Sequence, residues 1–176
     1  GTKIGMGWPE RFDVIEWVKL IISWDSNAQI ILHGVSMGAA TVLMASGEEL
    51  PENVKAIIAD CGYTSEWDEF KCEANALHIP WFPVLNAASV LSRLRDGYDF
   101  KQASALEKVK QSRIPTLFIH GSDDELVPYS MLDKLYSAAA CEKECLTVNG
   151  AGHALSSSVE PELYWNTVES FIEKYS

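Results

Sequence analysis

Two patterns of apolar residues alternate along the chain. Four short runs are typical of strands; they cover residues 28–33, 53–61, 114–121 and 143–150. The first is continuously apolar and β-branched, as strands buried on both faces are, and the second is expected to be buried as well. The stretches around the four runs have helical spacing or helix-forming composition; they cover residues 9–24, 37–49, 130–140 and 161–175. This alternation predicts an α/β fold, a three-layer sandwich in which helices cover both faces of a parallel sheet.

The helical stretches carry apolar stripes that predict which side faces the core. In the first helix the stripe contains Phe12, Ile15, Val18 and Ile22, and Pro9 is tolerated because it stands in the first turn. The stripes of two later helices consist of Leu132, Leu135, Tyr136 and Ala139, and of Tyr164, Val168, Phe171, Ile172 and Tyr175.

Residues 64–110 follow neither pattern. They are aromatic and interrupted by prolines, and they contain only short helical stretches. We expect a cap-like insertion here, within one domain over residues 1–176, because a chain of this length is the size of a single domain. Aromatic residues of the segment fit either packing or a pocket wall; they are Trp67, Phe70, Trp81 and Phe82.

Charge and cysteine content narrow the classes of function. The net charge of −11 argues against a nucleic-acid partner and against an anionic membrane surface. The four cysteines form no C-x-x-C pair, so we expect no metal site, and Cys61 ends an apolar run as a buried thiol would. No apolar run approaches the ~20 residues of a membrane span. The location stays open between the cytoplasm and, if a signal segment lies upstream, a membrane anchor or the extracellular space.

Three polar side chains follow predicted strands in a suggestive order. Ser36 follows the first strand between two glycines, Asp124 follows the third with Asp123 beside it, and His153 follows the fourth. The carboxyl ends of parallel strands share one edge of the sheet, so the three side chains should meet there. Serine attacks well only when a base takes its proton, histidine is suited to that task, and a carboxylate orients the imidazole. The N–H of Met37, at the start of a helix, would face a developing oxyanion.

These motifs carry a family resemblance. "HGVSMG" resembles the nucleophile elbow of α/β-hydrolases, "HGSDDELVP" their acid turn and "GAGHALS" their histidine loop, while "IGMGWPERFD" and "ADCGYTSEWDEF" resemble bacterial serine hydrolases of the dienelactone-hydrolase and prolyl-peptidase-like branch. The resemblance covers essentially all 176 residues. It implies Ser36 as nucleophile, Asp124 as acid, His153 as base and the Met37 N–H as one oxyanion donor, without a metal or organic cofactor. Val127, Trp67 and Phe82 are candidates for the substrate pocket.

In one respect the chain departs from the family. About half of the family's sheet, with the loop that gives the second oxyanion donor, precedes the elbow, whereas only 35 residues precede Ser36 here. The sequence therefore resembles the carboxyl-terminal part of an α/β-hydrolase. We expect weak activity from this part alone. We also expect the strand edge at residues 29–33 to self-associate or to pair with the missing amino-terminal segment.

Other polar residues fit plainer roles. His33 and His120 stand at strand ends and are expected to be structural, bonded to backbone groups, and His78 is expected at the surface or at a helix cap. Asp60 is a weaker alternative for the acid. The function expected is cleavage of a small-molecule carboxylic ester through an acyl-enzyme. A peptidase or thioesterase with the same triad, or a non-catalytic binding module, is the alternative.

Overall fold

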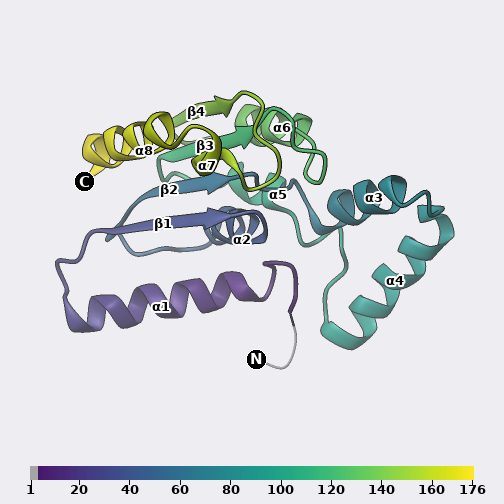
Figure 1. Cartoon of the computed structure of the whole chain (residues 1–176). Helices are drawn as coiled ribbons and strands as arrows, with labels where there is room; N and C mark the ends of the chain where they lie inside the picture. The colour runs from purple at the N-terminus through teal and green to yellow at the C-terminus, as the bar shows by residue number, and fades with distance from the viewer. Residues whose placement is uncertain (1–3) are drawn as a thin grey trace.

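A four-stranded parallel sheet forms the centre of the molecule (Figure 1). The structure is a computed structural model that describes residues 4–176. The strands lie in the order β1-β2-β3-β4, the same order as in the sequence. Their bounds are Ile30–Val35, Val54–Asp60, Thr116–Gly121 and Lys143–Val148. The sequence-based prediction of four parallel strands is therefore confirmed, and all four carboxyl ends lie at one edge.

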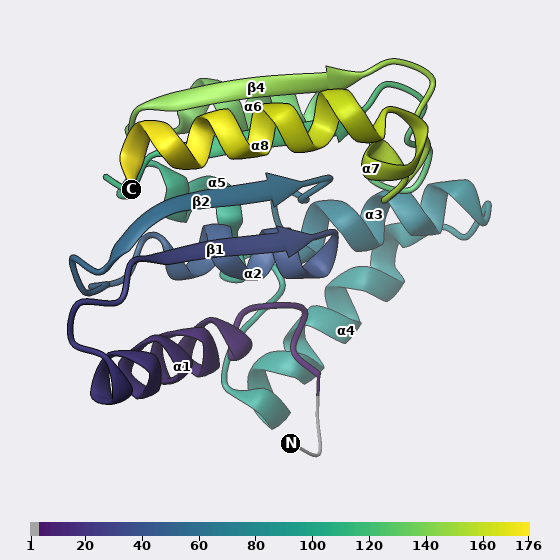
Figure 2. The same cartoon turned by 60° about the vertical axis from the view of Figure 1, so that its left-hand side comes forward.

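Helices cover both faces of the sheet, which confirms the three-layer architecture. In Figure 2 helix α8 lies in front of the sheet and α2, α5 and α6 lie behind it. The helices are α1 (Glu10–Trp24), α2 (Met37–Ala45), α3 (Glu66–Ala76), α4 (Trp81–Asp96), α5 (Ala105–Val109), α6 (Ser130–Ala138), α7 (Ser156–Val159) and α8 (Pro161–Tyr175). Successive strand residues face opposite layers: Ile57 packs in the core with α2, and Ile58 packs in the core with α8. Burial on both faces explains the apolar runs of β2 and β3, whereas the expectation is wrong for β1, which is buried mainly on one face, and β4 is mostly half-buried.

The predicted stripes of α6 and α8 face the core, but that of α1 is partly wrong. Ile15 and Val18 are buried, whereas half of Phe12 is exposed. The neighbouring Arg11, rather than Phe12, is buried. Its Nε donates to Oε1 of Glu48 at 2.8 Å, and its guanidinium carbon lies 3.5 Å from the ring centroid of Trp8. An arginine buries its charge at low cost when it has such partners, and an apolar periodicity cannot anticipate them.

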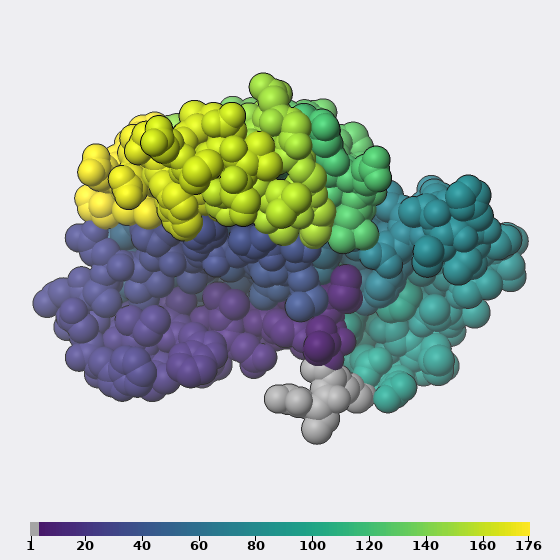
Figure 3. Space-filling view, viewed as in Figure 1, coloured from purple at the N-terminus to yellow at the C-terminus, as the bar shows by residue number. Residues whose placement is uncertain are grey.

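Helices α3 and α4 form an arm that projects beyond the carboxyl edge of the sheet (Figures 1 and 3). The segment is more regular than its sequence indicates, because Pro80 and Pro83 stand at the start of α4, where proline is tolerated. The arm spans residues 66–96, and it is shorter than the predicted insertion because α5 packs in the main core through Ala105 and Val109. None of the described helices combines the length and the apolar character that a membrane crossing requires.

Candidate active site

Ser36 occupies a strained turn between β1 and α2. Its φ of 56° lies in the left-handed region that a side chain rarely adopts. Gly34 makes the turn possible, since a Cβ there would lie 2.3 Å from the carbonyl carbon and oxygen of Gly38. A Cβ at Gly38, in contrast, would meet nothing within 4 Å. Only the first glycine of the pair is therefore required by sterics, and it presents the Ser36 hydroxyl at the sheet edge.

Asp124 is held in the loop after β3 by backbone donors. Its Oδ1 accepts from the N–H groups of Leu126 at 3.0 Å and Val127 at 2.9 Å. The side chain of Asp124 is fully buried. Its other oxygen, Oδ2, lies 3.3 Å from Nε2 of His120 and 2.9 Å from Nδ1 of His153. The loop therefore aims a buried carboxylate at two imidazoles.

His153 connects this carboxylate to the serine. Its Nδ1 is bonded to Asp124, and its Nε2 lies 2.7 Å from Oγ of Ser36. The loop after β4 is seated against the end of β3, where a Cβ on Gly121 would lie 2.2 Å from the carbonyl oxygen of Ala151. The structure thus brings together the three side chains that the strand-end argument selected, in one chain of hydrogen bonds.

Electrostatics keep the Asp124 carboxyl ionised. Burial alone would raise its pKa, but hydrogen bonds from His120, His153 and the Val127 N–H outweigh burial, and the pKa is lowered. His120 is buried and bonded through Nε2 to the carbonyl of Val127 at 2.9 Å, which confirms the expected backbone bond. Its contact with Asp124 was not expected. His120 lies at the carboxyl end of β3, and Asp124 follows four residues later in the next loop. The same argument that brought the three strand-end residues together could therefore have predicted this contact.

Cys61 is a neighbour of the triad that sequence reasoning placed only in the core. The thiol is buried as expected, and no disulfide involves it. Its sulfur and the ligand atoms of Asp124 and His153 all lie within 4.8 Å of one another. The residue has a φ of 49°, and burial, followed by the charge of Asp60, raises the pKa of its thiol to about 12. Cys61 therefore stands beside the relay as a neutral thiol.

Asp60 and His33 belong to a second polar group on the α8 side of the sheet. Asp60 is buried, accepts from Oγ of Ser156 at 3.2 Å, and has a pKa raised by burial. The carboxylate hydrogen-bonded to His153 is that of Asp124 rather than Asp60. The expected backbone bond of His33 is wrong: its Nε2 lies 3.0 Å from the hydroxyl of Tyr164. His78 is exposed just after α3, as expected.

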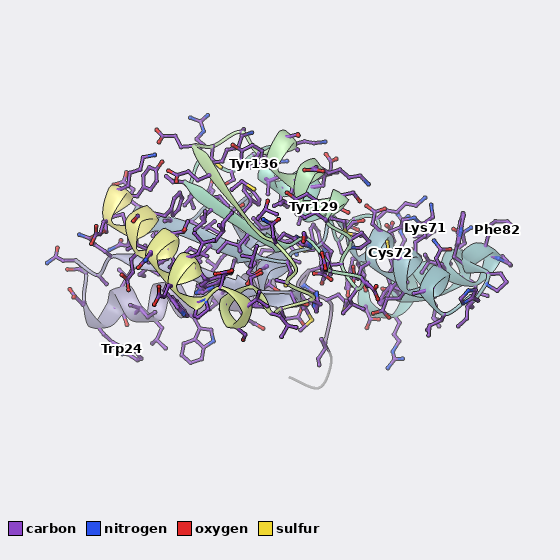
Figure 4. All side chains as sticks on the ribbon, turned by 45° about the horizontal axis from the view of Figure 1, so that its top comes forward. Trp24, Lys71, Cys72, Phe82, Tyr129 and Tyr136 are labelled. Carbon is purple, nitrogen blue, oxygen red and sulfur yellow. The ribbon has the colours of Figure 1, made fainter. Side chains whose placement is uncertain are left out.

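Of the candidate pocket residues, Val127 belongs to the acid loop, whereas Trp67 and Phe82 belong to the arm and are linked through the ring of Trp81. Val127 is fully buried and supports the acid loop through its N–H. Trp67, at the base of the arm, has its ring 6.4 Å from that of Trp81. Phe82 is 63% exposed at the outer end of the arm, far from Tyr129, which contacts His120 (Figure 4). A pocket wall built from Trp67 and Phe82 stays a prediction.

Met37, the predicted oxyanion donor, lies next to the serine. It is the first residue of α2, directly after Ser36. The first N–H groups of a helix have no acceptor within that helix, and the helix dipole favours negative charge beside them. The geometry therefore supplies a donor adjacent to the serine hydroxyl.

Two buried carboxyl groups at the base of the arm were not anticipated. Glu66 and Glu69, one turn apart at the start of α3, are 3% and 5% exposed. In the described part of the chain, Oε2 of each lacks a hydrogen-bond partner. Burial, reinforced by nearby acids, raises the pKa of Glu66 to about 8 and that of Glu69 to about 7. The sequence offers one signal for them: both glutamates lie in the first turn of the helix that follows the carboxyl end of β2.

The fold and this site together define an α/β-hydrolase. More specifically, the chain belongs to the prolyl oligopeptidase family, whose model matches residues 7–176. It is 29% identical over 175 residues to the uncharacterized protein YqkD of Bacillus subtilis, covering 98% of this chain and 57% of that protein. It is also 29% identical over 131 residues to the lysophosphatidylserine lipase ABHD12 of Macaca fascicularis, covering 74% and 32% of the two chains.

A solved structure agrees with this assignment at the level of fold. The esterase Pf2001 of Pyrococcus furiosus superposes with a TM-score of 0.75 at 20% identity, over 99% of this chain and 65% of that one. The chain therefore spans a little over half of YqkD and about two thirds of Pf2001. These matches establish the family and the α/β-hydrolase fold.

Proposed function

We propose that the protein cleaves carboxylic esters through an acyl-enzyme, with Ser36 as nucleophile, His153 as general base and Asp124 as the residue that orients the imidazole. One observation carries the proposal: the continuous hydrogen-bonded relay from Asp124 Oδ2 through both ring nitrogens of His153 to Ser36 Oγ. A serine capping a helix has no need of a histidine at 2.7 Å, nor of a buried carboxylate behind it.

The chemistry follows from that relay. Ser36 Oγ attacks the ester carbonyl while Nε2 of His153 takes the hydroxyl proton, and the imidazolium that forms is stabilised by Asp124. The Met37 N–H donates to the oxyanion of the tetrahedral intermediate. Collapse breaks the bond to the leaving alcohol, which receives the proton from His153. Water then attacks the acyl-enzyme by the same steps, so the proposed reaction requires neither a metal nor an organic cofactor.

An ester is the proposed substrate class because the similar proteins named for a substrate include an esterase and a lysophospholipid lipase. The family name favours a peptidase as the second candidate. Both reactions, and thioester cleavage, use the same triad and differ in the leaving group. The third alternative is a module that binds in the site without turnover.

A fluorophosphonate probe separates catalysis from binding. We expect covalent labelling of the native chain and none of Ser36→Ala at equal folding by circular dichroism. A paired assay with a nitrophenyl ester and the matching anilide then distinguishes the leaving groups; we expect the ester to turn over and the anilide to lag. An intact protein that takes no label at Ser36 refutes the hydrolase proposal.

We propose in addition that the edge of β1, at the predicted residues 29–33, pairs with a further strand. Within residues 4–176 β1 pairs only with β2. An apolar strand with unpaired backbone groups is a template for pairing with a second copy or with another segment of a hydrolase domain. A second oxyanion donor supplied with that strand would add about 10²–10³ in rate, so we expect slow turnover by the 176-residue chain alone.

A further inference from the structure

The outer surface of the arm is apolar although it faces solvent. Seven large apolar side chains between Leu77 and Leu94 are exposed: Leu77, Ile79, Phe82, Val84, Val90, Leu91 and Leu94. Leu94 is 81% exposed, the highest value among the large apolar residues of the described chain. Scattered apolar residues are ordinary on a surface, but a contiguous cluster on a projecting element indicates an interaction site.

Helix α4 has one face that packs against the protein and an opposite face that carries the exposed apolar side chains. Leu85 and Ser89 are buried against the arm base, and Oγ of Ser89 accepts from the N–H of Phe100 at 3.1 Å. Leu91 and Leu94 lie one turn apart on the opposite side, in an amphipathic arrangement with the apolar stripe turned outward. The apolar stripe is therefore a separate, exposed face of α4 and not part of the core.

The charge of the same segment differs from that of the whole molecule. Residues 74–95 contain two arginines and no aspartate or glutamate, while the chain as a whole carries a net charge of −11. The arginines, Arg93 and Arg95, are both exposed near the carboxyl end of the apolar stripe. The net charge of the whole molecule therefore does not describe the stretch 74–95, although acidic residues adjoin it: Glu73 and Asp96 flank it, and Arg93 lies 3.9 Å from a carboxylate oxygen of Asp99.

Aromatic rings stand at the outer end of the arm. The rings of Trp81 and Phe82 are in edge contact, with centroids 6.2 Å apart, and Figure 4 shows Phe82 at the extremity of the molecule. Aromatic residues beside an apolar stripe, with arginines flanking it, are typical of helices that lie in the interface of a lipid bilayer. The surface is a protruding lobe in Figure 3, which suits insertion between headgroups.

We propose that the arm docks the protein on a phospholipid surface, with the apolar stripe of α4 and the Trp81–Phe82 end inserted and Arg93 and Arg95 at the lipid phosphates. The arm projects from the carboxyl edge that holds Ser36 (Figure 1), so docking brings this edge close to the bilayer. If the proposed esterase function holds, acyl esters carried by the bilayer are then within reach of the site. The docking itself does not depend on catalysis.

Vesicle flotation tests the proposal. We expect the native chain to float with phosphatidylcholine vesicles that contain a minor fraction of phosphatidylglycerol, and to float less with phosphatidylcholine alone. Leu91→Gln with Leu94→Gln should weaken partitioning at least ~10-fold. The matched control is Trp17→Gln with Leu20→Gln, which removes two exposed apolar side chains from α1 and should leave partitioning unchanged.

Further measurements distinguish a loss of vesicle binding from a loss of catalysis or of folding. Ser36→Ala should bind vesicles like the native chain, so a loss of catalysis does not imitate a loss of docking. Circular dichroism and thermal melting verify that the glutamine variants fold. The proposal is overturned if the native chain fails to float, or if both double variants lose partitioning equally. It is also overturned if sedimentation shows a dimer that the arm variant abolishes and no vesicle binding, since a second copy would then cover the stripe.

Discussion

Nε2 of His153 lies 2.7 Å from Oγ of Ser36, although 117 positions separate the two residues in the sequence. The serine follows β1 and the histidine follows β4, three strands away, a distance of about 14 Å at the usual strand spacing. The loop after β4 must therefore return across the sheet edge. This loop packs against the end of β3 through the contact of Ala151 with Gly121. The hydrogen bond between His153 and Ser36 therefore depends on loop packing as well as on strand order.

Replacing the carboxylate of Asp124 should show whether it orients the imidazole of His153 without contributing to substrate binding. We expect Asp124→Asn to lower kcat by about 10⁴, because the amide favours the wrong imidazole tautomer, with little change in KM. The matched control is Asp123→Asn, an exposed neighbour whose Oδ1 accepts from Oγ of Ser122 at 2.7 Å. Steady-state kinetics on a nitrophenyl ester provide the measurement. Equal losses in both variants would contradict the assignment of Asp124.

The two glycines around Ser36 should respond differently to alanine. Gly34→Ala places a Cβ 2.3 Å from the backbone of Gly38, so we expect a loss of at least ~2 kcal/mol in the free energy of unfolding and a displaced serine. Gly38→Ala meets open space in a helix and should stabilise by up to ~1 kcal/mol. Urea unfolding of both variants provides the comparison, and a larger loss in Gly38→Ala would show that the elbow is packed otherwise.

The strand pattern and the order of Ser36, Asp124 and His153 were sufficient to predict the sheet and the edge that holds the three side chains, because parallel strands end at the same edge. The return of the His153 loop across that edge depends on packing that the strand order does not reveal. Arg11 and Cys61 show where sequence fails. Arg11 is buried on the core side of α1 because Glu48, 37 positions away, forms an ion pair with it and the nearby ring of Trp8 stacks on its guanidinium. The position of Cys61 beside the triad depends on its left-handed backbone, which composition does not reveal.

The thiol beside the triad should be inert in the folded protein. Burial raises the pKa of Cys61 to about 12, and only the thiolate reacts readily with alkylating reagents. We expect N-ethylmaleimide at neutral pH to modify the exposed Cys145 first and to leave Cys61 unmodified until the chain unfolds. Peptide mass spectrometry after timed quenching follows each site. Early modification of Cys61 would mean that the sheet edge is open.

Stability should fall as pH rises through the neutral range. The folded protein holds a proton on Glu66 up to about pH 8, whereas the unfolded chain releases it near 4.5. Unfolding therefore releases protons between these values, and the free energy of unfolding declines across that window as pH rises. Glu66→Gln removes the contribution of Glu66 and should gain on the order of 5 kcal/mol over the native chain from pH 4 to pH 9, while Glu69, whose pKa is raised to about 7, keeps its own smaller contribution.

Denaturant unfolding at several pH values measures this effect. Glu169→Gln, at an exposed position of α8, is the control, and its unfolding curves should follow those of the native chain. Parallel pH profiles of Glu66→Gln and the native chain would mean that the carboxyl of Glu66 is hydrated or paired.

The open edge of β1 should be visible as an alternation of amide exchange. The N–H of Ile30 donates to Asn53 and that of Ser36 donates to Asp60, so the even-numbered positions of the strand face β2. The N–H groups of Ile31 and His33 consequently point away from the sheet. In dilute solution we expect these two amides to exchange at least ~10-fold faster than those of Leu32 and Gly34, which the ladder protects.

Pairing of this edge should remove the alternation. A strand that docks on β1, from a second copy or from another segment of a hydrolase domain, accepts from Ile31 and His33 and protects them without changing Leu32. We therefore expect their exchange to slow as the concentration of the chain rises, or when a longer chain supplies the strand. Residue-resolved hydrogen exchange by NMR across a concentration series measures this, with sedimentation giving the oligomeric state. Amides of Ile31 and His33 that stay equally unprotected at every concentration and in the longer chain would show that this edge is not a site of strand pairing.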